Sequence, residues 1–525
     1  MAACVDGSLE RPFARCRIMT RPVFRPIFLT LALCSLIPAQ SNPAAAAAKT
    51  WRESHEREIL SEFRDLLAIP DIASDSANIR RNAEFIRTMY ERRGVTMRIV
   101  ADPGANPIVV GEIRAPGASR TIALYAHYDG QPLDPKEWVT PPFEPTLRDA
   151  PLERDGRIIP FASATFPLNP EYRLYARSAS DDKAPIVAMA TAIDALRAAG
   201  TKLRSNIRFV FEGEEEAGSP NLERVIAAHR DLFAADLWLI CDGPVAQTRQ
   251  QLIAFGARGI VQTDITTYGP RRELHSGHYG NWAPNPAMML ARLLASMKDD
   301  SGRVLINGFY DGIEPLSATE KRAIAESPDV DSDLRKELWL GSTESSPRRL
   351  IELLQLPSLN VRGLASSRIG AQASNVIPST ATAALDIRLV KGMDFHRITE
   401  RLIDHVRRQG YFVTDAEPNA ETRMAHERVA RIVAHEGAYN AVRTSMDLPI
   451  SQEIIRVVES ARGPSVRVPT MGGSVPLEMI ERAAGTRTIT IPIANHDNSQ
   501  HSFNENIRIH NLWDGIELMA ALIAM

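Results

Sequence analysis

The sequence predicts an α/β fold, a mostly parallel sheet covered by helices, into which a second, α+β domain is inserted. Short and almost wholly apolar runs alternate with helical patterns in the first half of the chain, as in parallel strands buried on both faces. Further along, the strands instead alternate apolar and polar residues, as in a sheet with one face in water. The doubly covered pattern returns after Pro449. The first domain is therefore interrupted by the second rather than followed by it.

The first part of the α/β domain covers residues 49–254. Two helices open it: apolar residues recur at helical spacing over 56–69, and a second helix over 78–93 ends before Gly94. The strands expected next are 121–126, 207–211 and 237–241, with helices over 184–199 and 222–229 between them.

The inserted domain covers residues 255–446, and residues 447–525 complete the first domain. Alternating burial predicts strands in the insertion, and helical spacing predicts the helices that cover them. The expected elements are strands 259–268 and 381–390 with helices 284–297 and 395–409, then helices 451–462, 476–484 and 507–523 around a strand at 488–493.

Residues 1–48 have the pattern of a signal peptide. Arg21 and Arg25 precede an apolar run over 27–37, and a stretch of small residues follows at 43–48. The apolar run is shorter than the roughly 20 residues that a membrane-spanning helix needs. We therefore expect an exported protein, periplasmic or secreted, with no membrane span after processing and a mature chain that begins within 44–51.

The composition excludes several classes of protein. The 44% of hydrophobic and 24% of charged residues is ordinary for a globular chain of 525 residues. A formal net charge of -3 lacks the basic surplus that phosphate binding needs, so we expect no nucleic-acid partner. Of the four cysteines only Cys241 lies beyond the leader, which excludes an internal disulfide and a multi-cysteine metal site.

Histidines and carboxylates follow four of the expected strands. In an open parallel sheet, ligands bind beyond the carboxyl ends of the strands. Each of these residues alone has a structural explanation, as a core histidine, a turn former or a solvated helix start. Taken together they mark one edge of the sheet as a site. In chain order they are His127 with Asp129, the glutamates of segment 212–216, Asp242, and the loop 494–502 with His496, Asp497 and His501.

A divalent metal would hold these anions at the sheet edge, because carboxylates withdrawn from water need a strong cation. Without a cysteine cluster, histidine and carboxylate ligands fit zinc, and manganese or cobalt are also compatible. Asp181 and Asp182 precede the helix expected at 184–199. They either cap that helix or supply a carboxylate that bridges two metals, and beside the other clusters we favour the bridge.

Five segments, "HYDGQP", "SASDDKAP", "EGEEEAGS", "CDGP" and "QHSFNENI", occur in this order. In type and order they resemble the motifs of the M20 family of two-zinc metallopeptidases, most closely its dipeptidase branch, which includes the carnosinases. The resemblance covers about residues 51–525. It implies a catalytic α/β domain that carries the metals and an inserted lid domain that mediates dimerisation, so we expect a homodimer.

The resemblance also implies a role for each metal ligand and for the groups beside them. His127 and Asp242 would bind one metal, Glu216 and His501 the other, and Asp181 would bridge the two. Asp129 would accept a hydrogen bond from the ring of His127 and so fix its tautomer. Glu215 would be the general base that takes a proton from the bridging water.

The inserted domain would contribute to catalysis and to substrate binding. The segment "RELHSGHYGN" makes His275 a candidate stabiliser of the oxyanion, with His278 as the weaker competitor. Arg388 in "LDIRLV" suits a substrate carboxylate. The segment "MGGSVP" resembles the family's substrate loop and supplies Gly472, Gly473 and Ser474. Pro185 departs from the family pattern, which has glycine there.

The function expected from these residues is an exported dizinc metallopeptidase that hydrolyses dipeptides or short peptides. An amidohydrolase or deacylase of N-acyl or N-carbamoyl amino acids is the alternative among enzymes, because related folds perform both reactions with the same metals. A non-catalytic homologue that binds metal or peptide is the third hypothesis. Glu215 and all five ligand positions are intact, which argues against that third hypothesis.

Overall fold

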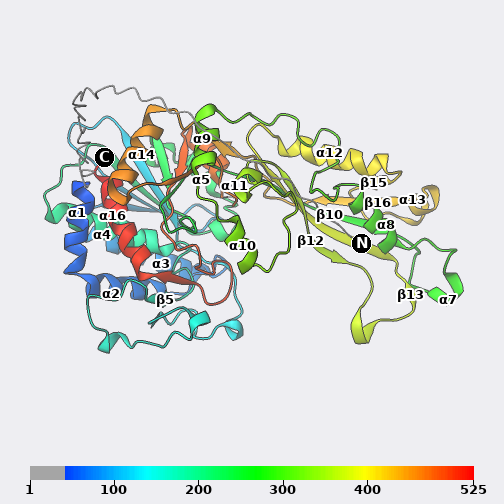
Figure 1. Cartoon of the computed structure of the whole chain (residues 1–525), viewed down its shortest axis with the longest axis horizontal. Coiled ribbons are helices and arrows are strands. Elements are labelled where there is room, and N and C mark those ends of the chain that lie inside the picture. Colours follow the sequence, from blue (N-terminus) through cyan, green and yellow to red (C-terminus); the bar gives the residue numbers. More distant parts are fainter. Residues whose placement is uncertain (1–41, 474) are drawn as a thin grey trace, which may run out of the picture. The chain divides into compact units, whose positions relative to one another are not determined.

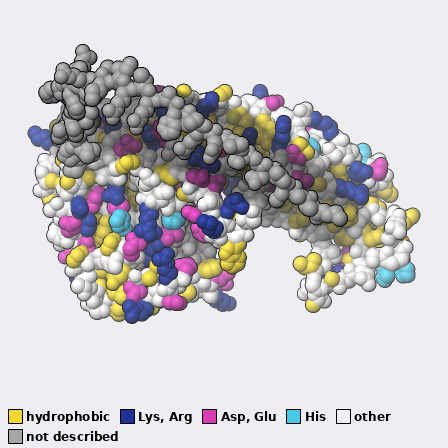
Figure 2. Space-filling model, in the orientation of Figure 1, with side chains coloured by type: hydrophobic (Ala, Val, Ile, Leu, Met, Phe, Trp, Pro, Cys, Tyr) yellow, Lys and Arg dark blue, Asp and Glu magenta, His cyan; other side chains and the backbone are white. Residues whose placement is uncertain are grey.

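The computed structural model describes residues 42–473 and 475–525. Most of the expected leader, and Ser474 of the substrate loop, lie outside the described residues. Among the described residues no helix is both long enough and apolar enough to cross a membrane. Side chains of both charges are interspersed over the visible face (Figure 2), as the small net charge requires.

An eight-stranded sheet forms the core of the α/β part, and its central strands are parallel. Strands β6, β3, β7 and β19 run in the same direction. Strand β2 is antiparallel to both of its neighbours, β1 and β6, and β19 is antiparallel to β8. In spatial order the strands are β1 (Thr96–Val100), β2 (Ile108–Ile113), β6 (Asn206–Glu212), β3 (Thr121–His127), β7 (Leu237–Ile240), β19 (Thr488–Thr490), β8 (Leu252–Ala254) and β18 (Val466–Val468).

Helices cover both faces of this sheet, as the apolar runs predict. Along β3, Ile122 and Leu124 belong to one hydrophobic core, while Ala123 and Tyr125 belong to another on the opposite face. The first core is closed by α1 (Pro43–Glu53), α2 (Glu56–Leu67), α3 (Ser76–Glu91), α4 (Lys183–Ala198), α14 (Pro449–Arg462) and α16 (Ile509–Ile523), and the second by α5 (Leu222–Ala228), α6 (Arg230–Phe233) and α15 (Leu477–Ala484).

The second sheet is built from residues between β8 and β18, which pair with each other in the first sheet. Its two longest strands alternate buried and half-buried residues along their length, so one face packs on helices α8 (Pro286–Ala295) and α12 (Phe395–Arg408). The strand order is β12 (Ser358–Ala365), β14 (Thr380–Leu389), β10 (Gly259–Tyr268), β16 (Val429–Ala434) and β15 (Phe412–Thr414), of which only the last two are parallel.

Shorter elements complete the described chain. A three-stranded sheet joins β20 (Asn506–Arg508), β5 (Arg173–Tyr175) and β4 (Thr146–Arg148), and two-residue strands pair β9 (Gly256–Ala257) with β17 (Val442–Arg443) and β11 (Leu274–His275) with β13 (Val376–Ile377). The remaining helices are α7 (Ser276–Tyr279), α9 (Ala318–Glu326), α10 (Asp331–Glu337), α11 (Leu350–Leu353) and α13 (Ala420–Ala425).

The small residues that we expected at the end of the leader form the first turns of α1. The side chain of Asn42 caps this helix by accepting from the backbone N–H groups of Ala44 and Ala45, at 3.0 and 3.2 Å. Ala44, Ala45 and Ala48 are buried, and α1 packs against α16 and α4 (Figure 1). Alanine at these positions therefore serves close helix packing.

Candidate metal centre

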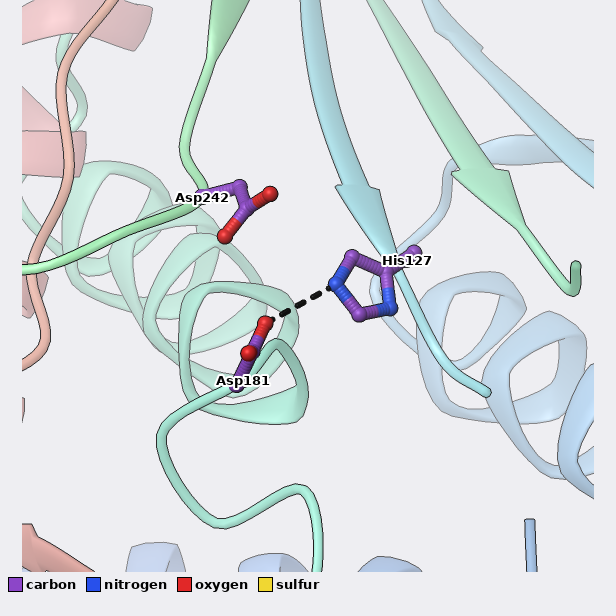
Figure 3. A group of neighbouring side chains, drawn as sticks. All are labelled: His127, Asp181 and Asp242. Atoms are coloured by element: carbon purple, nitrogen blue, oxygen red, sulfur yellow. Dashed lines mark hydrogen bonds and ion pairs between the residues drawn. The ribbon is translucent and has the colours of Figure 1, made fainter. Parts of the chain in front are cut away.

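Five predicted ligands form two groups that share Asp181. His127, Asp181 and Asp242 make one group, and Asp181, Glu216 and His501 make the other, with the ligand atoms of each group within 4.8 Å of one another. His127 Nε2 lies 3.0 Å from Asp181 Oδ1, and His501 Nε2 lies 3.2 Å from Asp181 Oδ2. In Figure 3 the side chains of the first group point toward a common space. Each oxygen of Asp181 therefore faces a different group.

The parallel strands deliver three of these side chains to one edge of the sheet. His127 is the last residue of β3, and Asp242 lies two residues after the end of β7. Glu216 lies in a single helical turn, Glu215–Ala217, after β6. Asp181 lies two residues before α4, and His501 comes from the loop that leads into β20. The rule that ligands gather beyond the carboxyl ends of parallel strands thus holds here.

The buried carboxylates of the cluster repel one another when no cation lies between them. Burial raises the pKa of Asp242 to about 7 and that of Glu216 to about 8, and in both cases the carboxylate of Asp181 adds to the effect. The ion pair with Asp181 raises the pKa of His501 to about 9. Burial alone would lower the pKa of His127, but the adjacent carboxylates of Asp129 and Asp181 raise it well above its usual value.

These properties fit two divalent cations. Two imidazoles and three carboxylates form a ligand set for zinc or a similar metal, and Asp181 can bridge two ions through its two oxygens. A cation between the carboxylates would offset the repulsion that raises the pKa values of Asp242 and Glu216.

Asp129 orients the site through two different parts of the residue. Nδ1 of His127 lies 3.0 Å from the backbone carbonyl of Asp129 and 3.5 Å from its carboxylate. The carboxylate instead accepts from the backbone N–H groups of Glu215 and Glu216, each at 3.0 Å. The predicted contact with the His127 ring is therefore made mainly by the carbonyl, and the side chain holds the turn that carries both glutamates.

The expectation that metal holds the whole glutamate cluster is wrong for two of its members. Glu212 is buried and accepts from the hydroxyl of Tyr125 at 2.6 Å, and burial raises its pKa to about 8. Glu214 accepts from the backbone N–H groups of Asn106 and Asn221, both at 3.0 Å. Hydrogen bonds therefore keep these two carboxylates beside the ligand Glu216.

Glu215 lies beside the ligands without belonging to either group. It lines the same pocket as Asp181, Glu216 and Asp242. Withdrawal from water raises its pKa well above the usual range, and Asp242 and Glu216 add to the shift, while His127 acts in the opposite direction. A carboxyl group with a raised proton affinity at this place suits proton transfer.

Glu505 is a functional residue that the sequence reasoning missed. It is fully buried, and its carboxylate accepts from the backbone N–H groups of Ser178, Ser180 and Asp181 at 2.9 to 3.0 Å. It also accepts from the Ser180 hydroxyl and pairs with Arg177, both at 2.9 Å. Five donors thus fix the loop that carries the bridging carboxylate. The only signal in the sequence was its place in the last motif.

Lys183 and Asp71 form a second buried feature that the sequence did not reveal. The ammonium of Lys183 lies 2.7 Å from the carboxylate of Asp71 and donates to the carbonyls of Leu66 and Ile69, both at 3.2 Å. Both charged side chains are completely buried. The pair joins the start of α4, two residues after Asp181, to the segment that follows α2.

A pocket of about 660 Å³ is lined by four of the five predicted metal ligands and by predicted substrate contacts. Arg388 lines it, with Asp386 3.3 Å from its guanidinium, and Gly472 and Gly473 form another wall. Ser474 lies outside the described residues. Gln131, which donates to Glu216 at 2.6 Å, and Tyr439 also face this space and were not predicted.

Three histidines that the sequence analysis considered lie outside the two ligand groups. His275 is exposed, accepts from the backbone N–H of Gly277 at 3.0 Å, and stacks near His278 with 4.5 Å between ring centres. Neither of these two residues lines the metal pocket of the same chain. His496 belongs to neither ligand group.

Asp497, its neighbour, is a structural residue. It pairs with Arg173 at 2.6 Å and with Arg508 at 3.0 Å. These two ion pairs hold the pKa of Asp497 far below its usual value, although burial opposes them. Of the two histidines of this loop, His501 is the one that belongs to a ligand group.

The profile of peptidase family M20/M25/M40 matches residues 123–525. The chain belongs to this family. Among its relatives, the human Beta-Ala-His dipeptidase is 27% identical over 94% of this chain and 96% of its own length. The Cys-Gly metallodipeptidase dug1 of Schizosaccharomyces pombe is 24% identical over 89% of this chain and 95% of its own. The predicted M20 family and its dipeptidase branch are confirmed.

The fold of this M20 peptidase also matches solved structures. The M20 family metallo-carboxypeptidase Sso-CP2 from Sulfolobus solfataricus superposes with a TM-score of 0.73 and 27% identity, over 89% of this chain and 98% of that one. The predicted fold class is confirmed, and with it the assignment of the chain to the peptidase hydrolases.

Proposed function

We propose that this M20 peptidase is an exported dizinc enzyme that hydrolyses dipeptides or short peptides. The observation that carries the proposal is the pair of ligand groups that share Asp181. The names of its relatives, a Beta-Ala-His dipeptidase and a Cys-Gly metallodipeptidase, support small peptides as the substrate class. Zinc is the first metal to test, followed by manganese and cobalt.

His127 and Asp242 would hold one ion, Glu216 and His501 the other, and Asp181 both. Once bound, the two ions would supply Lewis acidity for the scissile carbonyl and acidify a water molecule between them. Asp129 keeps the Nδ1 side of His127 occupied, which leaves Nε2 to face the metal. Gln131 donates to Glu216 and so fixes the orientation of that carboxylate.

Glu215 would act as the general base. Its carboxylate takes the proton from the attacking water and later returns it to the leaving amine, which is why it must touch the reacting atoms without ligating a metal. The hydrogen bond from the Glu215 backbone N–H to Asp129 holds the turn in place during this transfer.

The other side of the pocket would bind the free end of the peptide. Arg388 would pair with the substrate carboxylate, and the backbone of Gly472 and Gly473 would lie along the peptide. Such a binding mode limits the length of the substrate on the carboxyl side of the scissile bond, because further residues there would have to pass the guanidinium.

His275 would stabilise the oxyanion only from a partner subunit, since it does not line the pocket of its own chain. We therefore include a homodimer in the proposal. Mixing His275→Ala with Glu215→Gln protein should regenerate one working centre per heterodimer. If heterodimers form and no activity returns, the cross-subunit arrangement is refuted.

The reaction is tested on a panel of dipeptides against N-acetyl and N-carbamoyl amino acids. We expect hydrolysis of dipeptides by the wild-type protein and about a hundredfold less, or lower still, by the Glu215→Gln variant purified in the same way, which controls for contaminating peptidases. Turnover confined to the acylated amino acids would establish an amidohydrolase instead. Binding without turnover of any compound would leave a non-catalytic homologue.

A further inference from the structure

A second, apolar pocket lies against the metal pocket. Its volume is about 240 Å³, below the roughly 300–1,000 Å³ of pockets that enclose a whole small ligand. Aliphatic side chains form most of its wall, among them Leu252, Ile351, Leu354, Val466 and Val468. A space of this size and lining accommodates one apolar side chain rather than a complete substrate.

The two pockets share part of their walls. Pro244, Leu252, Met471 and Gly472 line both of them. Pro244 follows the metal ligand Asp242 by two residues, so the segment that leaves the metal centre continues directly into the apolar pocket. A substrate held over the metals therefore has the apolar pocket within reach of its side chains.

Gly472 marks the boundary between the two spaces. A Cβ atom at this position would lie 3.0 Å from Leu354 Cδ2, closer than ordinary contact. The absence of a side chain there lets Leu354, the residue that follows α11, approach the substrate loop, and keeps the boundary between the two pockets thin.

The outer wall of the apolar pocket is held in place by hydrogen bonds. Arg349 donates to the carbonyls of Ile324 and Ser327 at 2.6 and 3.0 Å. The backbone N–H of Leu350 donates to Asp331 at 2.8 Å, and Gln355 donates to the carbonyl of Thr470 at 3.1 Å. The first three bonds hold the segment 324–355 together, and the bond from Gln355 ties it to Thr470, just before the substrate loop, so the pocket is preformed.

We propose that this pocket is a specificity subsite that receives the apolar side chain of the carboxyl-terminal residue of the substrate. The inference rests on the proposed peptidase function. Arg388, which would bind the substrate carboxylate, and Gly472 both line the metal pocket, and Gly472 also bounds the apolar pocket. Because the scissile carbonyl would lie over the metals and the carboxylate at Arg388, the residue between them is the carboxyl-terminal one, and we assign its side chain to the apolar pocket.

The test compares the dipeptides Gly-Gly, Gly-Ala, Gly-Leu and Gly-Phe with Leu-Gly and Phe-Gly. For the wild-type protein we expect kcat/KM for Gly-Leu to exceed that for Gly-Gly by about tenfold or more, since each buried methylene is worth a factor of this order. The reversed dipeptides should not gain in the same way. A preference that follows the amino-terminal residue, or no preference at all, overturns the proposal.

Two variants on one helix separate the subsite from general packing. Ile351→Asp places a charge in the pocket and should reduce the Gly-Leu to Gly-Gly ratio to about one. Leu353→Asp is the matched control, because Leu353 lies on the same helix but lines a different cavity, beside Lys298 and Tyr310. Its ratio should stay at the wild-type value. Equal loss in both variants contradicts the subsite.

A third variant fills the pocket. Ala246 lines it, and Ala246→Phe should exclude Gly-Phe and Gly-Leu more strongly than Gly-Ala. Because this substitution adds volume without charge, the same selective loss in it and in Ile351→Asp rules out misfolding as the cause of the effect. A uniform loss over the four peptides contradicts the assignment.

A binding measurement separates the subsite from the proposed chemistry. In metal-loaded Glu215→Gln protein, calorimetry should give a lower Kd for Gly-Leu than for Gly-Gly by about tenfold, and Ile351→Asp in the same background should remove the difference. If this holds while the wild-type protein hydrolyses no peptide, the subsite stands and the peptidase proposal fails. If peptides are hydrolysed and bound without regard to the side chain, the subsite is refuted and the peptidase proposal stands.

Discussion

Asp181 occupies its place because the residues around it leave it little freedom. Its backbone N–H donates to Glu505, and each of its oxygens faces a different histidine. The loop therefore presents both lone-pair sides of one carboxylate to the space between the two ligand groups. This arrangement of a single buried side chain would let one carboxylate serve two metals rather than one.

We expect Glu215 to be needed for turnover but not for metal binding. Glu215→Gln should keep both metals, because Glu215 belongs to neither ligand group. It should lower kcat by about a hundredfold or more, since the amide cannot accept the proton. Metal analysis and dipeptide kinetics on the same preparation check this. Loss of a metal would mean that Glu215 and Glu216 exchange roles.

For Glu505 we expect the opposite: the residue should be needed for metal binding. Glu505→Gln keeps the size of the side chain but turns one acceptor into a donor that faces the N–H groups of the Asp181 loop. We expect the affinity for metal to fall about ten- to a hundredfold, measured by competition with a chelating dye.

Glu56→Gln is the matched control for Glu505→Gln. Glu56 is also buried and also accepts from an arginine, Arg52, and from a backbone N–H, that of Leu168, at 3.0 and 2.8 Å. It lies on α2 and touches no ligand loop. Equal metal affinities in the two variants would contradict the positioning role of Glu505.

At the scale of elements, local patterns predicted most boundaries and long-range contacts decided the rest. The alternation over 259–268 predicts β10 with both ends correct. Strand β19 stops at Thr490, before Pro492, which lacks the N–H that a ladder needs. The last helix begins at Ile509 because Asn506–Arg508 pair with β5.

Long-range contacts also explain why some buried residues of the site could not be predicted from the sequence. His127, Glu216 and Asp242 follow parallel strands, and the topology of the sheet makes their meeting predictable. Glu505 and the pair of Lys183 with Asp71 are joined to their partners across long stretches of sequence. No periodicity carries that information, so only the folded chain shows which charges are buried together.

Helix α1 gives a prediction about the start of the folded chain. Ala48 is fully buried and Ala46, two residues earlier, is exposed. Ala48→Asp should lower the free energy of unfolding by about 3 kcal/mol because it buries a charge, and Ala46→Asp should change it by less than about 0.5 kcal/mol. Denaturant titration of both variants checks this, and equal effects would contradict the packing of α1.

The position of α1 also refines the export proposal. A cut within 44–51 would remove the cap at Asn42 and the buried alanines, so we expect the leader to be cleaved before Asn42. Sequencing the amino terminus of protein collected outside the cytoplasm tests this. Retention of the segment 1–41 on that protein would argue against a cleaved leader.

For the whole molecule, the metal centre predicts a pH-dependent stability. In the metal-free protein the pKa values of Asp242 and Glu216 are raised to about 7 and about 8. The folded state therefore holds protons that the unfolded state has already lost, and stability falls as pH rises from about 4 to 8. His501, with a pKa of about 9, adds to the fall above pH 6.5.

Metal should reverse this dependence, because protons and cations compete for the same atoms. We expect the rise in melting temperature on adding zinc to be larger at pH 8 than at pH 5.5, as measured by calorimetry at both values. A larger stabilisation at pH 5.5 would contradict the assignment of the ligands.

The central claim is that two ions per chain, held around Asp181, make this M20 peptidase active. It is tested most directly by stripping the metal and following dipeptide hydrolysis while zinc is added back in measured equivalents. We predict no turnover in the stripped protein and a return of activity that saturates at two ions per chain. Full activity without metal, or saturation at a single ion, would contradict the two-metal site.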